Sequence, residues 1–208
     1  MSNKAYFAFI AWFQEALLAL GIGILIVLPV MLAYLPEYLP DWSYTTLFTI
    51  SLVAVFLVMM IRPLADLFPN VPWLRPLVIL RKGFGVLSAS IIVGIMFSKF
   101  MVDGVSYVID FFSPERWSLA EGAILAPLAD LSALLLLITS NKFSKRVLAK
   151  NWKRLQKLAY VYFYAGALYE YVLLGQAFAL VAMVLVTIVV VAAFVKNRWA
   201  PAASLQAV

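Results

Sequence analysis

Long apolar runs without charge are the feature that most constrains the fold of this chain. Residues 16–36 and 42–61 contain no Asp, Glu, Lys or Arg, and residues 158–195 contain only Glu170. A helix needs about 20 mainly apolar residues to cross the hydrocarbon core of a bilayer, which is about 30 Å thick. Hydrophobic residues make up 65% of the sequence, and a body of 23.2 kDa is too small to hide that much apolar surface. The sequence therefore predicts an all-α integral membrane protein.

We expect a six-transmembrane-helix bundle that forms a single domain over residues 1–208. The predicted spans cover residues 16–36, 42–61, 83–101, 119–139, 156–174 and 176–195. The last two spans share one apolar run of 38 residues, which is too long for a single crossing. Gly175 and Gln176 lie at the point where a tight hairpin would divide this run.

Two connections between the spans carry their own signals. Residues 105–112 are too short to cross a bilayer, so they predict a helix along the membrane interface with Tyr107, Phe111 and Phe112 buried. Residues 62–80 contain four prolines. Proline interrupts helix interiors, so we expect an irregular loop there.

The distribution of basic residues predicts the orientation. Fourteen of the 16 Lys and Arg residues fall in segments on one side of the predicted membrane, and only Lys99 and Arg116 lie opposite. An excess of Lys and Arg marks cytoplasmic loops. Both termini are therefore predicted to be cytoplasmic, in agreement with an even number of crossings. Because the basic residues lie between apolar spans, the net charge of +6 does not indicate a nucleic-acid partner.

The sequence contains no Cys and no His. Disulfides, iron–sulfur clusters, thiolate catalysis, Ser-His-Asp triads and imidazole-ligated haem are therefore excluded, and common zinc sites are not expected. We predict no catalytic residue and no metal site, and an enzymatic role is not favoured.

Asp130 is the strongest candidate for a functional residue. A carboxylate near the centre of a membrane helix costs about 2.5–3.5 kcal/mol, so it should face the bundle interior with a partner or a proton. Ser90 and Tyr164 are predicted at a similar depth and could form an intramembrane polar cluster with Asp130. Such a cluster is either a proton or ligand site or a simple contact between helices. Glu170 is expected nearer the interface, and Lys99 is expected to pair with Asp103.

Two further patterns bear on ligands and partners. The fifth span is rich in tyrosine, and a stack of aromatic rings could hold a quinone or flavin, although aromatic stripes usually reflect packing. A basic cytoplasmic loop without acidic residues is expected to contact anionic membrane lipids. It comprises Lys142, Lys145, Arg146, Lys150, Lys153, Arg154 and Lys157.

Several motifs resemble the ferric-reductase-like transmembrane domain family. They are Arg-Pro-Leu at 62–64, Trp-Leu-Arg at 73–75 and Leu-Arg-Lys-Gly-Phe-Gly-Val-Leu at 80–87. The stronger ones are Leu-Ile-Thr-Ser at 137–140 and Lys-Asn-Trp-Lys-Arg-Leu-Gln-Lys-Leu-Ala-Tyr at 150–160. The branch that contains the haem-binding membrane subunit of the bacterial methionine sulfoxide reductase system is the most similar.

This resemblance implies six spans and b-type haem held by His between the third and fifth of them. The positions of the family's histidines correspond to Gln156, Tyr169 and Ile95, none of which supplies an imidazole. The resemblance therefore implies the family's architecture in a bacterial inner membrane, while the residues argue against haem b.

Three functions remain open at this point. The leading hypothesis is a non-catalytic accessory or structural subunit of a larger membrane complex, with other membrane protein subunits as partners. The second is an electron-transfer protein that uses quinone or flavin in place of haem. The third is a small-solute or proton pathway through Asp130.

Overall fold

The computed structural model describes residues 3–40 and 42–199, which are helical and contain no strand. Nine α-helices occur in this part of the chain, together with short 3-10 turns. They are α1 (Asn3–Tyr34), α2 (Ser43–Leu67), α3 (Leu74–Leu77), α4 (Arg81–Asp103), α5 (Val105–Phe111), α6 (Leu125–Thr139), α7 (Lys142–Leu155), α8 (Leu158–Leu174) and α9 (Ala177–Trp199).

Five helical segments are long and apolar enough to cross a membrane, which indicates an integral membrane protein. They are Lys4–Tyr34, Ser43–Leu67, Leu74–Asp103, Ala120–Thr139 and Ala177–Arg198. The apolar helix α8 has 17 residues and is shorter than these five. Its length is about 26 Å at a rise of about 1.5 Å per residue, near the lower limit for a transmembrane helix.

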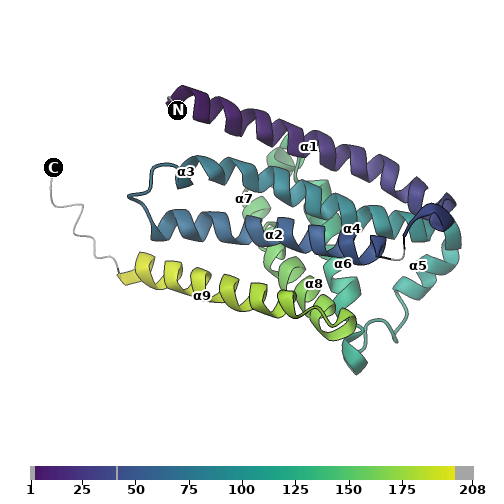
Figure 1. Cartoon of the computed structure of the whole chain (residues 1–208). Coiled ribbons are helices and arrows are strands. Elements are labelled where there is room, and N and C mark those ends of the chain that lie inside the picture. The colour runs from purple at the N-terminus through teal and green to yellow at the C-terminus, as the bar shows by residue number, and fades with distance from the viewer. Residues whose placement is uncertain (1–2, 41, 200–208) are drawn as a thin grey trace.

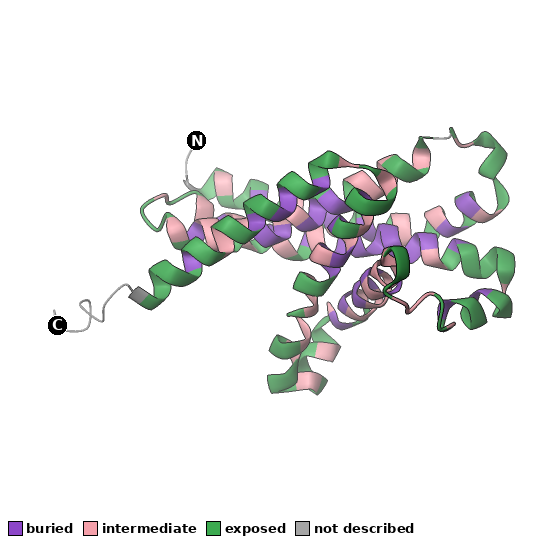
Figure 2. Cartoon of the chain, turned by 90° about the horizontal axis from the view of Figure 1, so that it is seen from below, coloured by how far each residue is buried: buried purple, intermediate pink, exposed green. Residues whose placement is uncertain are grey.

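The helices form two groups. The helices α1, α2, α4 and α9 run alongside one another, and α6 and α8 cross behind them at a steeper angle (Figure 1). The main core lies where the two groups meet, and Phe163 on α8 is completely buried there. Figure 2 shows the buried positions gathered along this central region, with exposed positions on the outer surfaces.

The start of α1 and the end of α9 lie at the same end of the bundle (Figure 1). Two hydrogen bonds tie both helices to the connection between α2 and α4. The Tyr6 hydroxyl donates to the Trp73 carbonyl at 2.8 Å, and the Lys196 ammonium donates to the Leu67 carbonyl at 2.6 Å. The opposite end of the bundle carries α5 and the turn between α8 and α9.

This turn and the helix at residues 105–112 are confirmed. Gly175 adopts the left-handed conformation with φ of +66°, and its N–H caps the Glu170 carbonyl between α8 and α9. The short helix α5 has Tyr107 and Phe111 buried in the bundle, whereas the Phe112 side chain is 66% exposed on its surface.

The expectation of an irregular loop over residues 62–80 is wrong at both ends. The helix α2 continues through Pro63 to Leu67, and helical turns resume at Leu74 and lead directly into α4. Proline leaves a helix carbonyl without its usual donor, and neighbouring groups can compensate in membrane helices. The Arg81 Nε donates to the Val58 carbonyl at 2.9 Å, one residue from the carbonyl that Pro63 leaves free.

Candidate functional site

A cavity of about 250 Å³ lies inside the bundle and is bounded by α2, α4, α6 and α8. Residues from α5 and from the segment after it close one side. Four charged side chains line this cavity, namely Lys99, Arg116, Asp130 and Glu170. Charged groups are costly inside a membrane and mark functional sites, so this cavity is the candidate site.

Two cationic side chains line the cavity near the end of the bundle where α5 lies. Lys99 is in the last turns of α4, and Arg116 follows α5 in the chain. The Arg116 Nε lies 2.9 Å from an Asp110 carboxylate oxygen, and its guanidinium stands 5.9 Å from the centroid of the Tyr107 ring. Asp110 and Tyr107 therefore hold Arg116 in position.

Tyr107 also contributes to this part of the cavity. Burial raises the pKa of Tyr107 to about 12, and the negative charge of Asp130 acts in the same direction. The phenol therefore stays neutral and available as a hydrogen-bond donor over the physiological pH range.

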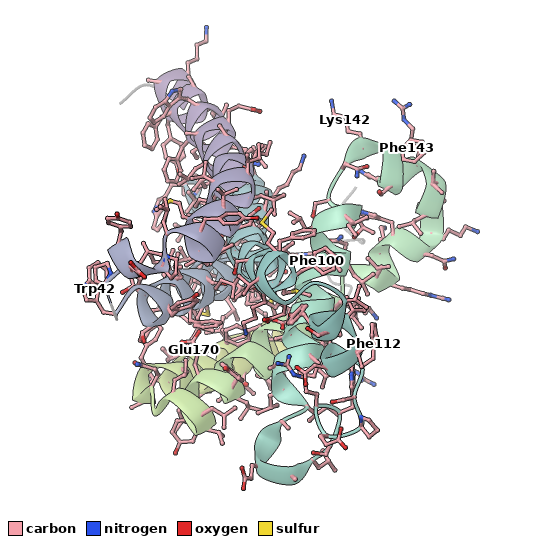
Figure 3. All side chains as sticks on the ribbon, turned by 90° about the vertical axis from the view of Figure 1, so that its right-hand side faces the viewer. Trp42, Phe100, Phe112, Lys142, Phe143 and Glu170 are labelled. Atoms are coloured by element: carbon pink, nitrogen blue, oxygen red, sulfur yellow. The ribbon has the colours of Figure 1, made fainter. Side chains whose placement is uncertain are left out.

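The two carboxylates line the cavity from the neighbouring helices α6 and α8. Asp130 lies on α6, and Glu170 lies on α8 about 6 Å before its end at a rise of about 1.5 Å per residue. Glu170 is only 4% exposed, so its side chain is buried within the bundle beside the cavity. Neither carboxylate has a hydrogen bond or an ion pair with another described residue. Figure 3, viewed from the α5 end, shows Glu170 directed among the helices, whereas Trp42 and Phe112 lie at the periphery.

A cluster of three buried hydroxyl groups lies beside the cavity, which two of its residues, Ser51 and Tyr162, line. The Tyr162 hydroxyl lies 2.8 Å from Ser51 Oγ and 2.7 Å from Ser88 Oγ, and the two serine oxygens are 3.0 Å apart. Ser88 Oγ also donates to the Ser51 carbonyl at 2.8 Å. The cluster therefore connects α2, α4 and α8. Sequence reasoning missed it, because no spacing along the chain relates residues on three separate helices.

The cluster predicted from Asp130, Ser90 and Tyr164 is not joined by hydrogen bonds. The Ser90 hydroxyl is buried without a partner among the described residues. The Tyr164 hydroxyl lies 2.8 Å from Thr187 Oγ1 on α9. Of the three residues, only Asp130 lines the cavity. Equal depth along helices does not determine which side of each helix faces the others.

The expected pair of Lys99 and Asp103 is also absent, since the only ion pair among residues 3–40 and 42–199 joins Arg116 to Asp110. Lys99 lines the cavity instead. Its ammonium has no carboxylate within 4.0 Å in the described part of the chain.

The expected basic loop is a helix rather than a loop. Six of its seven basic residues belong to α7, and Lys157 directly precedes α8. Asn141 caps α7, because its side chain accepts the Ser144 N–H at 2.7 Å, and Ala149 breaks the helix with a φ of +42°. No residue of α7 is buried, and Lys142 and Phe143 stand clear of the other helices (Figure 3).

Two of the three positions that the expected resemblance would assign to haem ligands line this cavity. Ile95 on α4 and Tyr169 on α8 line it, together with Met96. Gln156 lies elsewhere, and its buried side-chain nitrogen has no partner among the described residues. Ile95 has no donor atom and the sequence has no imidazole. The residues present therefore do not fit the bis-imidazole haem that the resemblance implies.

The described residues also contain no group of three or more His, Cys, Asp or Glu side chains that could hold a metal ion. Asp130 and Glu170 supply two carboxylates, which is fewer than the six or more oxygen ligands that hard cations take.

No family model, curated protein or solved structure matches this chain. The cavity and its charged side chains are therefore the basis for assigning a function.

Proposed function

We propose that this protein is a haem-free, six-span membrane protein that binds a small polar solute in the cavity between α2, α4, α6 and α8. This function combines the resemblance to the ferric-reductase-like family with the hypothesis of a small-solute or proton pathway through Asp130. Tyr169 and Ile95 support the resemblance, because both line the cavity from helices that would face haem in that family.

The observation that carries the proposal is the pair of unpartnered carboxylates. Glu170 is 4% exposed, and neither it nor Asp130 pairs with a described residue although both border open space. Each ionisable side chain inside a membrane costs free energy unless a partner compensates it. A polar ligand in the cavity supplies that partner.

A polar solute suits the lining better than a quinone or flavin ring. Four charged side chains border a space of about 250 Å³. An aromatic ring would displace water from these charges without compensating them. Pockets for drug-sized ligands measure about 300–1,000 Å³, so this cavity suits a molecule smaller than a flavin.

The six-span topology, with both termini cytoplasmic, is part of the same proposal. The helix α8 counts as the fifth crossing, and the paired ends of α1 and α9 agree with an even number of crossings (Figure 1). The positive-inside rule orients α7 toward the cytoplasm and α5 toward the opposite side. The resemblance to a bacterial family favours the inner membrane.

Cysteine labelling tests access to the cavity, because any introduced cysteine is the only one in the chain. We expect Glu170→Cys, in protein reconstituted in vesicles, to react with a small, charged, membrane-impermeant thiol reagent. Ala167→Cys on the same helix is the control, since Ala167 is completely buried and does not line the cavity. Equal and negligible labelling of both folded variants would refute an aqueous binding cavity.

The same method tests the orientation. Ile109 on α5 and Phe143 on α7 are both well exposed, with 69% and 75% of their surfaces accessible. The proposal predicts that Ile109→Cys and Phe143→Cys react from opposite sides of a cell membrane, with Phe143→Cys on the cytoplasmic side. Labelling of both from one side would contradict the topology.

A role as accessory subunit remains a second candidate, and the surface of α1 favours it. Ala19 and Gly23 are exposed and lie four residues apart in an apolar groove that also includes Leu20 and Val27. Small residues at this spacing allow close contact between membrane helices. Co-purification in mild detergent would reveal a partner, and loss of that partner from Gly23→Leu but not from Val191→Leu on α9 would locate it on α1.

A further inference from the structure

We infer that the cavity binds a small zwitterion, with its ammonium group at Glu170 and its anionic group at Lys99 and Arg116. This inference rests on the proposed function and names the chemical class of the solute. It follows from the presence of both signs of charge in the lining of one cavity, where Asp130 interacts electrostatically with the two cations.

Glu170 marks the part of the cavity that receives a cation. Glu170 is more than nine-tenths buried, borders the cavity, and has no partner in the described part of the chain. Asp130 faces the same space from α6. Buried carboxylates are stabilised by charge-assisted hydrogen bonds, and an ammonium group can donate three of them.

Aromatic rings complete this part of the cavity. Tyr169 precedes Glu170 on α8, and its ring centroid lies 5.9 Å from that of Phe48 on α2. Both residues line the cavity. Ammonium groups are attracted to the faces of aromatic rings, so Phe48 and Tyr169 favour the ammonium group of the ligand, as Glu170 does.

The cations form the part of the cavity that receives an anion. Lys99 has no carboxylate within 4.0 Å among the described residues. Arg116 uses its Nε for Asp110 and also interacts with the Tyr107 hydroxyl, and a guanidinium carries further N–H donors. Arginine binds carboxylate and phosphate oxygens in a fixed geometry. The phenol of Tyr107, beside Arg116, adds a neutral hydrogen-bond donor.

Both signs are needed to satisfy the cavity. A simple cation would compensate Glu170 but would be repelled by Lys99, and a simple anion would be attracted by Lys99 but repelled by Glu170. No ion pair joins Lys99 or Arg116 to either cavity carboxylate, although both cations act electrostatically on Asp130. A molecule that carries both charges compensates Glu170 and the two cations together. Free amino acids and the phosphoethanolamine headgroup of a lipid share this chemistry.

Thermal unfolding of the full chain in an uncharged detergent tests the inference, because a ligand that binds the folded state raises the Tm. The soluble probes are glycine and phosphoethanolamine, with methylamine as the matched cation and acetate as the matched anion. Phosphatidylethanolamine added to the micelles is the lipid probe. We expect a concentration-dependent rise in Tm with at least one zwitterion and no comparable rise with methylamine or acetate. A rise in Tm with glycine or phosphoethanolamine would indicate a soluble ligand, and a rise with phosphatidylethanolamine would indicate a lipid headgroup.

Variants connect the effect to the cavity. Glu170→Gln should weaken zwitterion binding roughly tenfold or more, since a hydrogen bond to a charged group is lost. Glu115→Gln is the control, because Glu115 is exposed and does not line the cavity. An equal rise in Tm with methylamine or acetate, no rise with any zwitterion, or an unchanged effect in Glu170→Gln would overturn the inference. Cysteine labelling separates the two proposals, because a labelled cavity without zwitterion binding refutes only the inference, and an unlabelled cavity refutes both.

Discussion

Two serines on α4 provide a sharp test of how polar groups stabilise this bundle. Ser88 and Ser90 are both completely buried and lie two residues apart on the same helix. Ser88 joins the hydroxyl cluster with Ser51 and Tyr162, whereas the Ser90 hydroxyl has no partner among the described residues. Ser88→Ala and Ser90→Ala remove the same atom from two equally buried positions, but we expect opposite effects.

The magnitudes follow from the hydrogen bonds. Ser88→Ala removes the contact with the Ser51 carbonyl at 2.8 Å and the contact with the Tyr162 hydroxyl at 2.7 Å. Hydrogen bonds between membrane helices contribute about 0.6 kcal/mol on average and at most about 1.7 kcal/mol. The free energy of unfolding should therefore fall by about 1–2 kcal/mol. The Tyr162 hydroxyl keeps its bond to Ser51 at 2.8 Å, so no larger penalty arises.

Ser90→Ala should leave the free energy of unfolding unchanged or raise it. A buried hydroxyl without a hydrogen bond costs about 1–3 kcal/mol. Removal of the oxygen eliminates this cost and forfeits only a few van der Waals contacts, each worth about 0.1–0.2 kcal/mol. We expect a gain of up to about 1 kcal/mol.

Reversible unfolding in mixed micelles, with increasing mole fractions of a denaturing detergent, would compare the two variants with the unmodified chain. The double variant should show the sum of the two effects, because the two side chains share no hydrogen bond. Equal destabilisation by both substitutions, or a larger loss from Ser90→Ala, would refute the reasoning. That result would mean that side-chain packing along α4, rather than the hydroxyl cluster, determines stability at these positions.

Further predictions concern packing, cofactors and lipids. A Cβ at Gly83 would lie 2.8 Å from both Gln14 Oε1 and Leu17 Cβ, so Gly83→Ala should separate α1 from α4 and lower stability by about 1–3 kcal/mol. A Cβ at Gly85 would meet only a Val58 methyl at 3.8 Å, so Gly85→Ala should stabilise by up to about 1 kcal/mol in the same unfolding assay. The absorption spectrum of protein purified with added haem should show no Soret band, because the chain has no His or Cys; a band that persists after gel filtration would disprove this. Neutralisation of two exposed lysines of α7 should weaken binding of anionic lipid by about 1 kcal/mol per charge, measured by lipid competition in nanodiscs. An unchanged affinity would exclude α7 as the lipid-binding segment.

The helical, membrane-embedded character of the chain could be read directly from the sequence. Except for their first residues, the runs at 42–61 and 176–195 fall within α2 (Ser43–Leu67) and α9 (Ala177–Trp199). A bilayer-spanning segment is specified by local composition, because each backbone group must be satisfied within its own helix. The hairpin at Gly175 is equally local, since glycine adopts the left-handed conformation that ends α8.

Helix boundaries were less predictable where local rules compete with tertiary contacts. The helix α1 extends beyond the predicted span at 16–36, since it begins at Asn3 and continues through Gln14. The helix α2 passes through Pro63, which local preference disfavours. Side chains from neighbouring helices satisfy backbone groups at such points, because Gln14 accepts the Gly83 N–H in the first turn of α4 at 3.1 Å and Arg81 donates to the Val58 carbonyl of α2.

Asp130 shows how much of the candidate site can be predicted from the sequence. Its charge within an apolar run identified it as a functional candidate, and it lines the cavity. Its predicted neighbours Ser90 and Tyr164 lie outside the cavity lining, while Glu170 was expected at the membrane interface and is buried beside this space. Depth along a helix follows from residue number, but the direction in which a side chain points relative to other helices does not.

By itself the sequence determined that the chain is apolar enough to lie in a membrane, that it is helical, and that it has no imidazole or thiol ligand. These properties depend only on which residues occur and in what runs. Only the tertiary structure decided which polar groups meet. The rotation and crossing of α2, α4, α6 and α8 bring Ser51, Ser88 and Tyr162 together and direct two carboxylates and two cations into one cavity. Contacts between side chains on different helices depend on the rotation of each helix about its own axis, which the packing of the whole bundle sets.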